Sequence, residues 1–523
     1  MTGRRTAQHI LLCLPLIACL PIAAMAQQVS IASQVIERTL PNGLKVLMVK
    51  RSNMPTVRCI LAYRVGSVNE RPGITGISHM HEHMMFKGTY TMGIKPGTLE
   101  KDLEYNRQID LVEEEIVKEE AKLRGADEET TKAIRDRIVA LKKQAADLLE
   151  RQRKETIVSE EIWSAYQEAG GTGLNASTGK EMTQYYVTLP KNKIALFLAL
   201  EADRLENPVF REFYSERDVL VEERRMSENS PGFFFREQLN ATFYAASPYS
   251  WEVLGWMSDL AHITKQELID YRNLYYRPDN AVLVLAGDID VEATMALVNK
   301  YFGPIKSKDP SPRVRTEEPS PEYYRRVNSP DFKPPYIEKR VHGRAATNPY
   351  VAILFHIPPL WHADLAPLYV LGEVLSSRSG KMFREMVLKN EHATSVSARA
   401  GISEYDGQFT VQASARETRE GTAVPMDKLE QELWSYIEDA KTAPCDEQLL
   451  QRVKNQMEAA FLRSLAGTNI ASQLASMEIA YKWQFLDEQF RRRMAVTPAD
   501  LMRVAKKYLT RDNSVTGVLE RER

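Results

Sequence analysis

The sequence predicts an α+β protein of two related domains, each an antiparallel-rich sheet packed with helices, with a helical hairpin inserted into the first. Residues 305–336 are rich in proline, serine and charged side chains, which is typical of a linker. Strand and helix patterns on its two sides follow in a similar order and with similar lengths, which indicates a duplicated domain. A highly charged stretch with heptad spacing, residues 99–158, interrupts the first half.

The first strands of the chain are predicted from short apolar runs separated by turn residues. Ile36 to Lys50 is expected to form two strands around the turn Pro41-Asn42-Gly43, and Thr56 to Val65 a third. A loop rich in glycine, residues 66–76, then leads to a short helix expected over His79 to His83.

Two heptad seams predict an antiparallel coiled-coil hairpin over residues 99–158. The apolar positions of the two seams are Tyr105, Ile109, Val112, Ile116 and Leu123, followed by Ile134, Ile138, Leu141, Ala145 and Leu148. Gly125-Ala126-Asp127 breaks the pattern between them. The alternative is a single charged helix. Because the seams supply their own core, we expect that the hairpin can be removed without unfolding the first domain.

The rest of the first half alternates short strands with helices. Gln184 to Leu189 and Ala281 to Ala286 are predicted strands, the second of them fully buried. Asn192 to Leu205 and Ser215 to Ser227 are predicted helices, and the second is dense with carboxylates.

The pattern restarts beyond the linker. Strands are expected at Tyr350 to Ile357, Thr394 to Ala400 and Gln408 to Ala413, with a helix from about Leu365 and helices to the end of the chain. The expected division is therefore a leader at 1–26, a first domain at 27–310, a linker at 311–336 and a second domain at 337–523.

Composition limits the possible classes of function. The chain has 523 residues, 43% of them apolar, and a formal net charge of -1, so no bulk charge attracts it to nucleic acid. After the leader, no segment is long and apolar enough to span a membrane. The cysteines outside the leader, Cys59 and Cys445, lie in opposite halves, which argues against a disulfide framework and a cysteine-based zinc site.

The first residues have the features of a secretory signal peptide. Arg4 and Arg5 precede an apolar run from Ile10 to Ala24, and Ala24-Met25-Ala26 matches the usual cleavage pattern. The sequence therefore predicts a secreted, periplasmic protein. The alternative is a lipoprotein anchored through Cys19, because Leu16-Ile17-Ala18-Cys19 resembles a lipoprotein cleavage box.

Five residues, His79-Met80-His81-Glu82-His83, form the pattern H-x-x-E-H, the inverted zinc-peptidase signature. In a helix, His79 and His83 share one face and can hold one metal ion. Glu82 lies beside that face, close enough to take a proton from a water on the metal, whereas His81 points away. The alternative is a polar helix start whose histidines cap or pack. Catalytic zinc normally takes three protein ligands, so a third must come from elsewhere.

Four stretches of the sequence match one family closely. They are Gly66 to Thr89 around the histidines, Asn175 to Thr178, Tyr276 to Val282, and Gly287-Asp288. In these motifs the chain resembles the pitrilysin/insulysin family of inverted zinc metallopeptidases, and most of all the branch that contains mitochondrial processing peptidase. The likeness runs over most of residues 36–305 and more loosely over 338–523.

The resemblance implies a zinc endopeptidase with one Zn²⁺ per chain. The family takes its third ligand from an E-x6-E pattern, which makes Glu223 the ligand beside His79 and His83. Glu216, two helical turns earlier, would then hydrogen-bond a ligating histidine, and Glu82 would be the general base. By the residues alone, this acidic helix is a solvated face.

The resemblance also implies how substrate and partner bind. Asn175 and Ala176 match an edge strand that pairs with an extended peptide. Val387 and Thr394 stand where single-chain members carry an arginine and a tyrosine that hold the substrate. A homologous non-catalytic subunit is therefore expected to supply the missing pair; a homodimer is the alternative. The second domain itself is expected to have no metal site. The alternative function is a non-catalytic, peptide-binding or assembly subunit.

Overall fold

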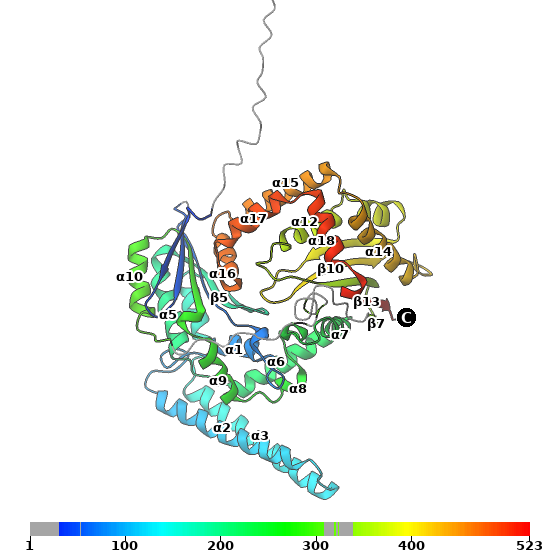
Figure 1. Cartoon of the computed structure of the whole chain (residues 1–523). Helices are drawn as coiled ribbons and strands as arrows, with labels where there is room; N and C mark the ends of the chain where they lie inside the picture. Colours follow the sequence, from blue (N-terminus) through cyan, green and yellow to red (C-terminus); the bar gives the residue numbers. More distant parts are fainter. Residues whose placement is uncertain are drawn as a thin grey trace, which may run out of the picture.

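The protein consists of two sheet-containing domains, from one of which a long helical hairpin projects (Figure 1). The computed structural model describes residues 31–52, 54–307, 318, 320, 323 and 338–522. The predicted leader, and the predicted linker apart from three single residues, lie outside the described residues. The predicted α+β class with two sheets is confirmed.

The first sheet has six strands in the order β1-β2-β6-β3-β5-β4. Their bounds are β1 Val35–Thr39, β2 Lys45–Lys50, β3 Thr56–Tyr63, β4 Thr172–Thr178, β5 Thr183–Pro190 and β6 Ala281–Gly287. Neighbours are antiparallel except for β2 and β6, which are parallel. Strand β4 is at an edge, and its outer side pairs with no other described strand.

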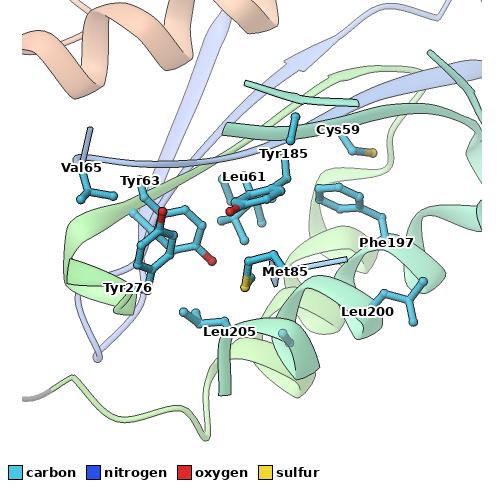
Figure 2. Close-up of a cluster of buried hydrophobic side chains, with 14 of the residues drawn as sticks. Cys59, Leu61, Tyr63, Val65, Met85, Tyr185, Phe197, Leu200, Leu205 and Tyr276 are labelled. Atoms are coloured by element: carbon cyan, nitrogen blue, oxygen red, sulfur yellow. The ribbon is translucent and has the colours of Figure 1, made fainter. Parts of the chain in front are cut away.

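Helices of the first domain cover one face of this sheet. They are α1 Ile77–Met84, α4 Glu161–Glu168, α5 Ile194–Glu206, α6 Phe213–Glu228, α8 Met257–Leu260, α9 Lys265–Tyr275 and α10 Val291–Phe302. The remaining helix of this half, α7 Phe233–Phe243, lies apart from that core. Figure 2 shows part of the core between sheet and helices, where Leu61 and Tyr185 meet Phe197, Leu205 and Met85.

The second sheet has the order β7-β13-β8-β10-β9. Its strands are β7 Lys339–Ala345, β8 Tyr350–Ile357, β9 Ala393–Ala400, β10 Gly407–Ala415 and β13 Ser514–Arg521. Its helices are α12 Leu365–Ser376, α13 Lys381–Phe383, α14 Met426–Thr442, α15 Glu447–Ser464, α16 Ile470–Ala480, α17 Phe485–Ala495 and α18 Pro498–Tyr508. The expectation of helices to the end of the chain was wrong, because the last element is strand β13. It lies between β7 and β8, and its partner β7 precedes it by more than 160 residues.

The two sheets share one topology, which supports the predicted duplication. If β1 is set aside, the five strands of each sheet, numbered in chain order, are arranged 1-5-2-4-3. In both sheets the first and fifth strands form the parallel pair. A common order and a common parallel pair follow most simply from one domain plan used twice.

Each domain also supplies a helix to the other domain's sheet. On β6, Leu283 and Leu285 face the first domain's own helices, whereas Val282 and Val284 pack against α16 of the second domain. Helix α7 of the first domain packs in turn on the second sheet. Both sheets are therefore buried on two faces, which explains why β6 is apolar at every position.

The predicted helical hairpin is present as α2, Leu99–Lys122, and α3, Glu128–Glu155 (Figure 1). Its two seams form a separate small core made of Val112, Ile116, Ile134, Ile138, Leu141 and Ala145. Gly125 has a φ of +81° in the turn, and Asp127 accepts a hydrogen bond from the backbone N–H of Thr130 at the start of α3. Among the described residues, no helix is long and apolar enough to cross a membrane.

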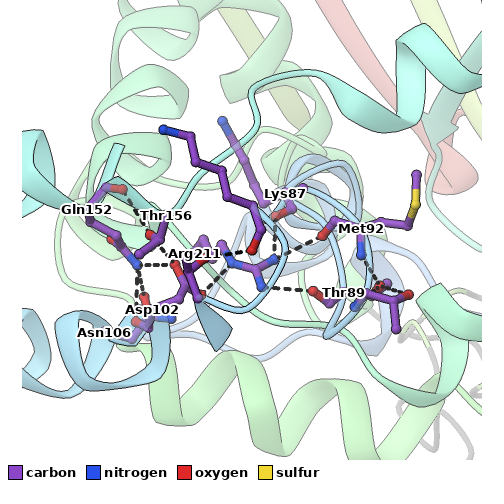
Figure 3. A network of polar contacts seen from close by, with 12 residues as sticks. Lys87, Thr89, Met92, Asp102, Asn106, Gln152, Thr156 and Arg211 are labelled. Atoms are coloured by element: carbon purple, nitrogen blue, oxygen red, sulfur yellow. Dashed lines mark hydrogen bonds and ion pairs between the residues drawn. The ribbon is translucent and has the colours of Figure 1, made fainter. Parts of the chain in front are cut away.

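The base of the hairpin is not separable from the first domain. Arg211, fully buried, donates to Asp102 Oδ2 at 2.6 Å and to the carbonyl of Thr89 at 2.8 Å (Figure 3). Gln152 and Thr156 of the other arm donate to Asp102 Oδ1 at 3.0 Å and 2.9 Å. Removal of the whole hairpin would leave a buried guanidinium without its carboxylate, so the expected freedom to delete residues 99–158 applies to the outer part alone.

Candidate metal centre

Helix α1 is preceded by Gly76, its N-cap residue, which has a φ of +93°. A Cβ at this position would also come within 2.7 Å of the carbonyl oxygen of Leu254. Both the positive φ and this close contact therefore require glycine. The carboxylate of Glu70 accepts hydrogen bonds at 2.9 Å from the backbone N–H groups of Gly76 and Ser78, which satisfies the start of the helix. Met80 and Met84 anchor the inner face of α1 in the core, which turns His79 and His83 outward.

The structure brings His79 and His83 of α1 together with Glu223 of α6. The two Nε2 atoms are 3.2 Å apart, and each lies 3.9 Å from Glu223 Oε2. Ligand atoms on a tetrahedral zinc ion would be about 3.4 Å apart, given bonds of about 2.1 Å. Among the described residues, this is the group of three candidate ligands whose donor atoms all lie within 4.8 Å of one another.

The protonation of this cluster suits a metal cation. Burial, and then the neighbouring His83, lower the pKa of His79 to about 4, so its imidazole is neutral near pH 7. His83 is turned with Nδ1 toward Glu216 Oε1, at 2.9 Å, so a proton on Nδ1 is held by that carboxylate. Burial lowers the pKa of His83, but its contacts with Glu216 and the charge of Glu223 raise it on balance, so a bound cation takes the place of the proton on Nε2. In its neutral form, His83 presents the lone pair of Nε2 to His79 and Glu223. Two imidazole lone pairs and one carboxylate are a donor set that fits zinc.

Glu216 supports the centre from a position on α6 two turns before Glu223. Its second oxygen accepts a hydrogen bond from Lys87 Nζ at 2.6 Å. Burial alone would raise the pKa of Glu216, but the contacts with His83 and Lys87 lower it to about 2. Glu216 therefore stays ionised and orients His83, as a carboxylate beside a ligating histidine does.

Glu82 lies next to the cluster on α1 and is held by the end of the edge strand β4. The hydroxyl of Thr178 donates to Glu82 Oε2 at 2.5 Å. Burial raises the pKa of Glu82, while the bond from Thr178 and the neighbouring His83 act in the opposite direction. A half-buried carboxylate with a raised pKa beside a candidate metal centre is suited to accept and return a proton.

His81 is not part of the cluster, as its position on the helix predicted. Its ring is fully buried and stacks on Tyr276, with the ring centroids 3.6 Å apart. Burial keeps the pKa of His81 well below its usual value, so the ring is neutral and packs as an aromatic side chain.

Asn175 and Ala176 lie on β4, paired with Tyr186 and Tyr185 of β5. The outer edge of β4 is free among the described strands, and β4 runs toward Thr178 and so toward Glu82. This is the geometry that an added peptide strand needs.

A cleft of about 670 Å³ opens between the domains at the same end of β4. Thr178, Lys180 and Glu181 line it from the first domain, and Gln408 and Gln473 line it from the second. Thr178, which donates to Glu82, is therefore a lining residue of the cleft as well as a contact of the candidate base. Sequence reasoning missed the cleft, because residues from 177 to 486 meet in it.

The two positions of the missing arginine and tyrosine lie in the second domain. Val387 is buried within a π-helical turn, Arg384–Lys389, and Thr394 is exposed on β9. Sequence reasoning also missed roles for Lys87 and Thr178. Lys87 follows His83 by four residues, and Thr178 ends the motif that begins at Asn175, so both lay within stretches already singled out.

Comparison with known proteins gives matches over most of the chain. The family profile described as "Insulinase (Peptidase family M16)" matches residues 45–104 and 126–255, and the profile described as "Peptidase M16 inactive domain" matches residues 262–457. The break at 105–125 falls within α2 and the turn of the hairpin.

Curated relatives and solved structures agree with these profiles. The zinc protease PqqE of Helicobacter pylori is 25% identical over 489 residues, 92% of each chain. A probable mitochondrial-processing peptidase subunit beta of Arabidopsis thaliana is 24% identical over 90% of this chain and 75% of its own length. The crystal structure of a protease from Helicobacter pylori superposes with a TM-score of 0.72 at 22% identity, over 93% of this chain and 99% of that one, which shows the fold.

Proposed function

The chain belongs to the M16 family of insulinase- and pitrilysin-like zinc metallopeptidases, and on that premise we propose that it is an active zinc endopeptidase that cleaves peptides bound in extended form. The observation that carries the proposal is the convergence of His79, His83 and Glu223 beside Glu82. In a family member without catalytic function, nothing would require three metal-binding side chains and a base to lie together in this arrangement.

We propose one Zn²⁺ per chain, with His79, His83 and Glu223 as ligands. The ion would supply a Lewis acid that polarises the scissile carbonyl and makes water acidic enough to lose a proton near neutral pH. Glu82 takes that proton and later delivers it to the leaving amine. Thr178 holds Glu82 in place, and Glu216 keeps His83 in the orientation and tautomer that ligation needs.

The proposed substrate is a short or unfolded peptide. Its backbone would pair with the outer edge of β4 at Asn175 and Ala176, and its continuation would enter the interdomain cleft. A cleft of about 670 Å³ accommodates several residues of an extended chain but no folded domain, so folded proteins should resist cleavage.

The test separates metal binding from chemistry. Glu82→Gln should retain zinc and the wild-type melting temperature but lose activity on an unstructured peptide by about 10²- to 10⁴-fold, the range of general acid–base catalysis. His83→Ala should lose both zinc and activity. Near-normal turnover by a clean Glu82→Gln preparation would show that another group is the base.

The second candidate function is a non-catalytic, peptide-binding or assembly subunit. One observation favours it: Val387 and Thr394 replace the arginine and tyrosine that the family resemblance led us to expect. We therefore propose that the chain works with a homologous subunit that carries the pair, or as a homodimer. Binding of the peptide by wild-type protein that contains zinc, without any cleavage, would favour the non-catalytic role.

We also propose that the protein is secreted to the periplasm; the alternative is a lipoprotein anchored through Cys19.

A further inference from the structure

Helix α6 carries both Glu216 and Glu223, and it begins with an unfavourable backbone conformation. Glu212, the residue that precedes its first turn, has a φ of +57° and a ψ of 22°. This left-handed region is disfavoured for any residue with a Cβ. Glu212 must therefore be held by its surroundings, and its side chain is nearly buried, with 14% of its surface exposed.

The inserted hairpin supplies that support through one residue. Arg153, near the end of α3, contacts the carboxylate of Glu212 through Nε and donates from its guanidinium to Ser215 Oγ at 3.0 Å. Glu212 and Ser215 are the two ends of the first turn of α6. One guanidinium therefore spans that turn, and its planar fork makes the contact directional.

The same carboxylate is connected to the metal centre. Lys87 Nζ lies 3.7 Å from Glu212 Oε2 and 2.6 Å from Glu216 Oε2. Glu216 Oε1 is 2.9 Å from His83 Nδ1. A continuous series of charged contacts thus runs from Arg153 through Glu212, Lys87 and Glu216 to His83.

The backbone of α3 next to Arg153 is held in place by buried polar contacts. The preceding residue, Gln152, donates to the buried Asp102 at 3.0 Å, and Asp102 pairs with Arg211 (Figure 3). Helix α2 adds two contacts along α6, since Tyr214 donates to Asp110 at 3.2 Å and Arg217 lies 3.5 Å from Glu113. The hairpin is therefore fastened to α6 along its base.

We propose that Arg153 is a positioning residue for the metal centre, through which the inserted hairpin fixes the first turn of α6 and so the orientation of Glu216 and His83. The inference rests on the proposed zinc site. It gives the insertion a role that the hairpin's own core does not require, because Arg153 lies outside the two apolar seams.

Three substitutions and one control test this. Arg153→Met removes the guanidinium and keeps the aliphatic stem; Arg153→Lys restores a charge. Glu212→Gly suits the left-handed backbone and removes the carboxylate together with the rest of the side chain. The control is Arg137→Met, because Arg137 pairs with Glu115 within the hairpin and both side chains are exposed.

Two readouts are measured in every variant: hydrogen exchange of residues 213–217 in metal-free protein, and the Kd for zinc by competition with a chelator. A third, the visible spectrum of Co²⁺-loaded protein, compares the two methionine variants. Arg153→Met should speed exchange in the first turn of α6 and raise the Kd roughly three- to tenfold, less than the 10- to 100-fold typical of groups that touch a ligand directly. Glu212→Gly should raise the Kd similarly, Arg153→Lys should recover part of the loss, and Arg137→Met should change neither readout. The visible spectrum of the Co²⁺-loaded protein should differ from that of wild type in Arg153→Met and should match it in Arg137→Met.

Unchanged exchange in Arg153→Met would overturn the inference, as would faster exchange with an unchanged Kd. Failure of wild-type protein to bind zinc would refute the proposed function instead, and exchange in the metal-free protein would still decide whether Arg153 holds α6.

Discussion

Thr178 donates a hydrogen bond of 2.5 Å to Glu82 and so joins the end of the edge strand β4 to the helix α1. This hydrogen bond fixes the position of the proposed general base relative to the strand that is proposed to bind the peptide. A peptide that extends β4 would lie in a fixed relation to Glu82.

Thr178→Val should lower kcat by roughly tenfold or more with little change in zinc content. The reason is that a hydrogen bond to a charged group contributes about 1.5–3 kcal/mol, and valine leaves the shape but removes the donor. Thr178→Ser keeps the donor and is the matched control. The measurement is steady-state cleavage of an unstructured peptide. Loss of activity in Thr178→Ser but not in Thr178→Val would mean that the methyl group, not the hydroxyl, matters.

The outer hairpin should be dispensable and its base should not. Replacement of residues 118–138 by a short glycine–serine turn should change the melting temperature by no more than a few degrees, because contacts of Asp102 and Arg153 remain. Asp102→Ala should destabilise the protein by about 3–5 kcal/mol, since it leaves Arg211 buried and unpaired. Denaturant unfolding of the two variants compares them directly, and comparable losses in both would contradict this division.

Acid should weaken the packing between α7 and the second sheet through His356. Its ring is buried against Phe243, with the centroids 4.0 Å apart, and burial, then the charge of Lys339, lower the pKa of His356 to about 3. The unfolded chain titrates near 6.5, so the folded state is fully favoured above that pH. Between about 6.5 and 3, only the unfolded state takes up the proton, and stability falls by up to about 1.4 kcal/mol per pH unit.

Urea unfolding at pH 7, 5 and 4 measures this slope. His356→Gln should be less dependent on pH than wild type, whereas His262→Gln, on an exposed loop, should keep the wild-type slope. Parallel curves for wild type and His356→Gln would assign the acid sensitivity to other groups.

The isolated chain should be a slow enzyme even with zinc bound. Val387 and Thr394 cannot supply the polar contacts that the family resemblance assigns to an arginine and a tyrosine, and poor positioning raises the barrier. The value of kcat/KM for one peptide is measured for the chain alone and with a co-expressed homologue that carries the pair. High activity alone, unchanged by the homologue, would contradict the need for a partner.

The sequence by itself determined the elements whose information is local. The four-residue spacing of His79 and His83 requires only one helical turn, and the heptads of the hairpin require only two adjacent helices. The alternating strands and helices on both sides of the linker predicted two related domains for the same reason. Glu223 was reached only by the family resemblance, because an acidic helix on its own reads as a solvated face.

Tertiary structure decided every relation that joins distant residues. Glu216 meets His83 across 133 positions, Thr178 meets Glu82 across 96, and β13 pairs with β7 although neither run is distinctive by itself. Arg153 looks like any charged position on a coiled coil until α6 is placed beside it. The physical reason is that helical and strand periodicity depend on neighbours a few residues away, whereas these contacts depend on how the complete cores of both domains pack, which no local pattern encodes.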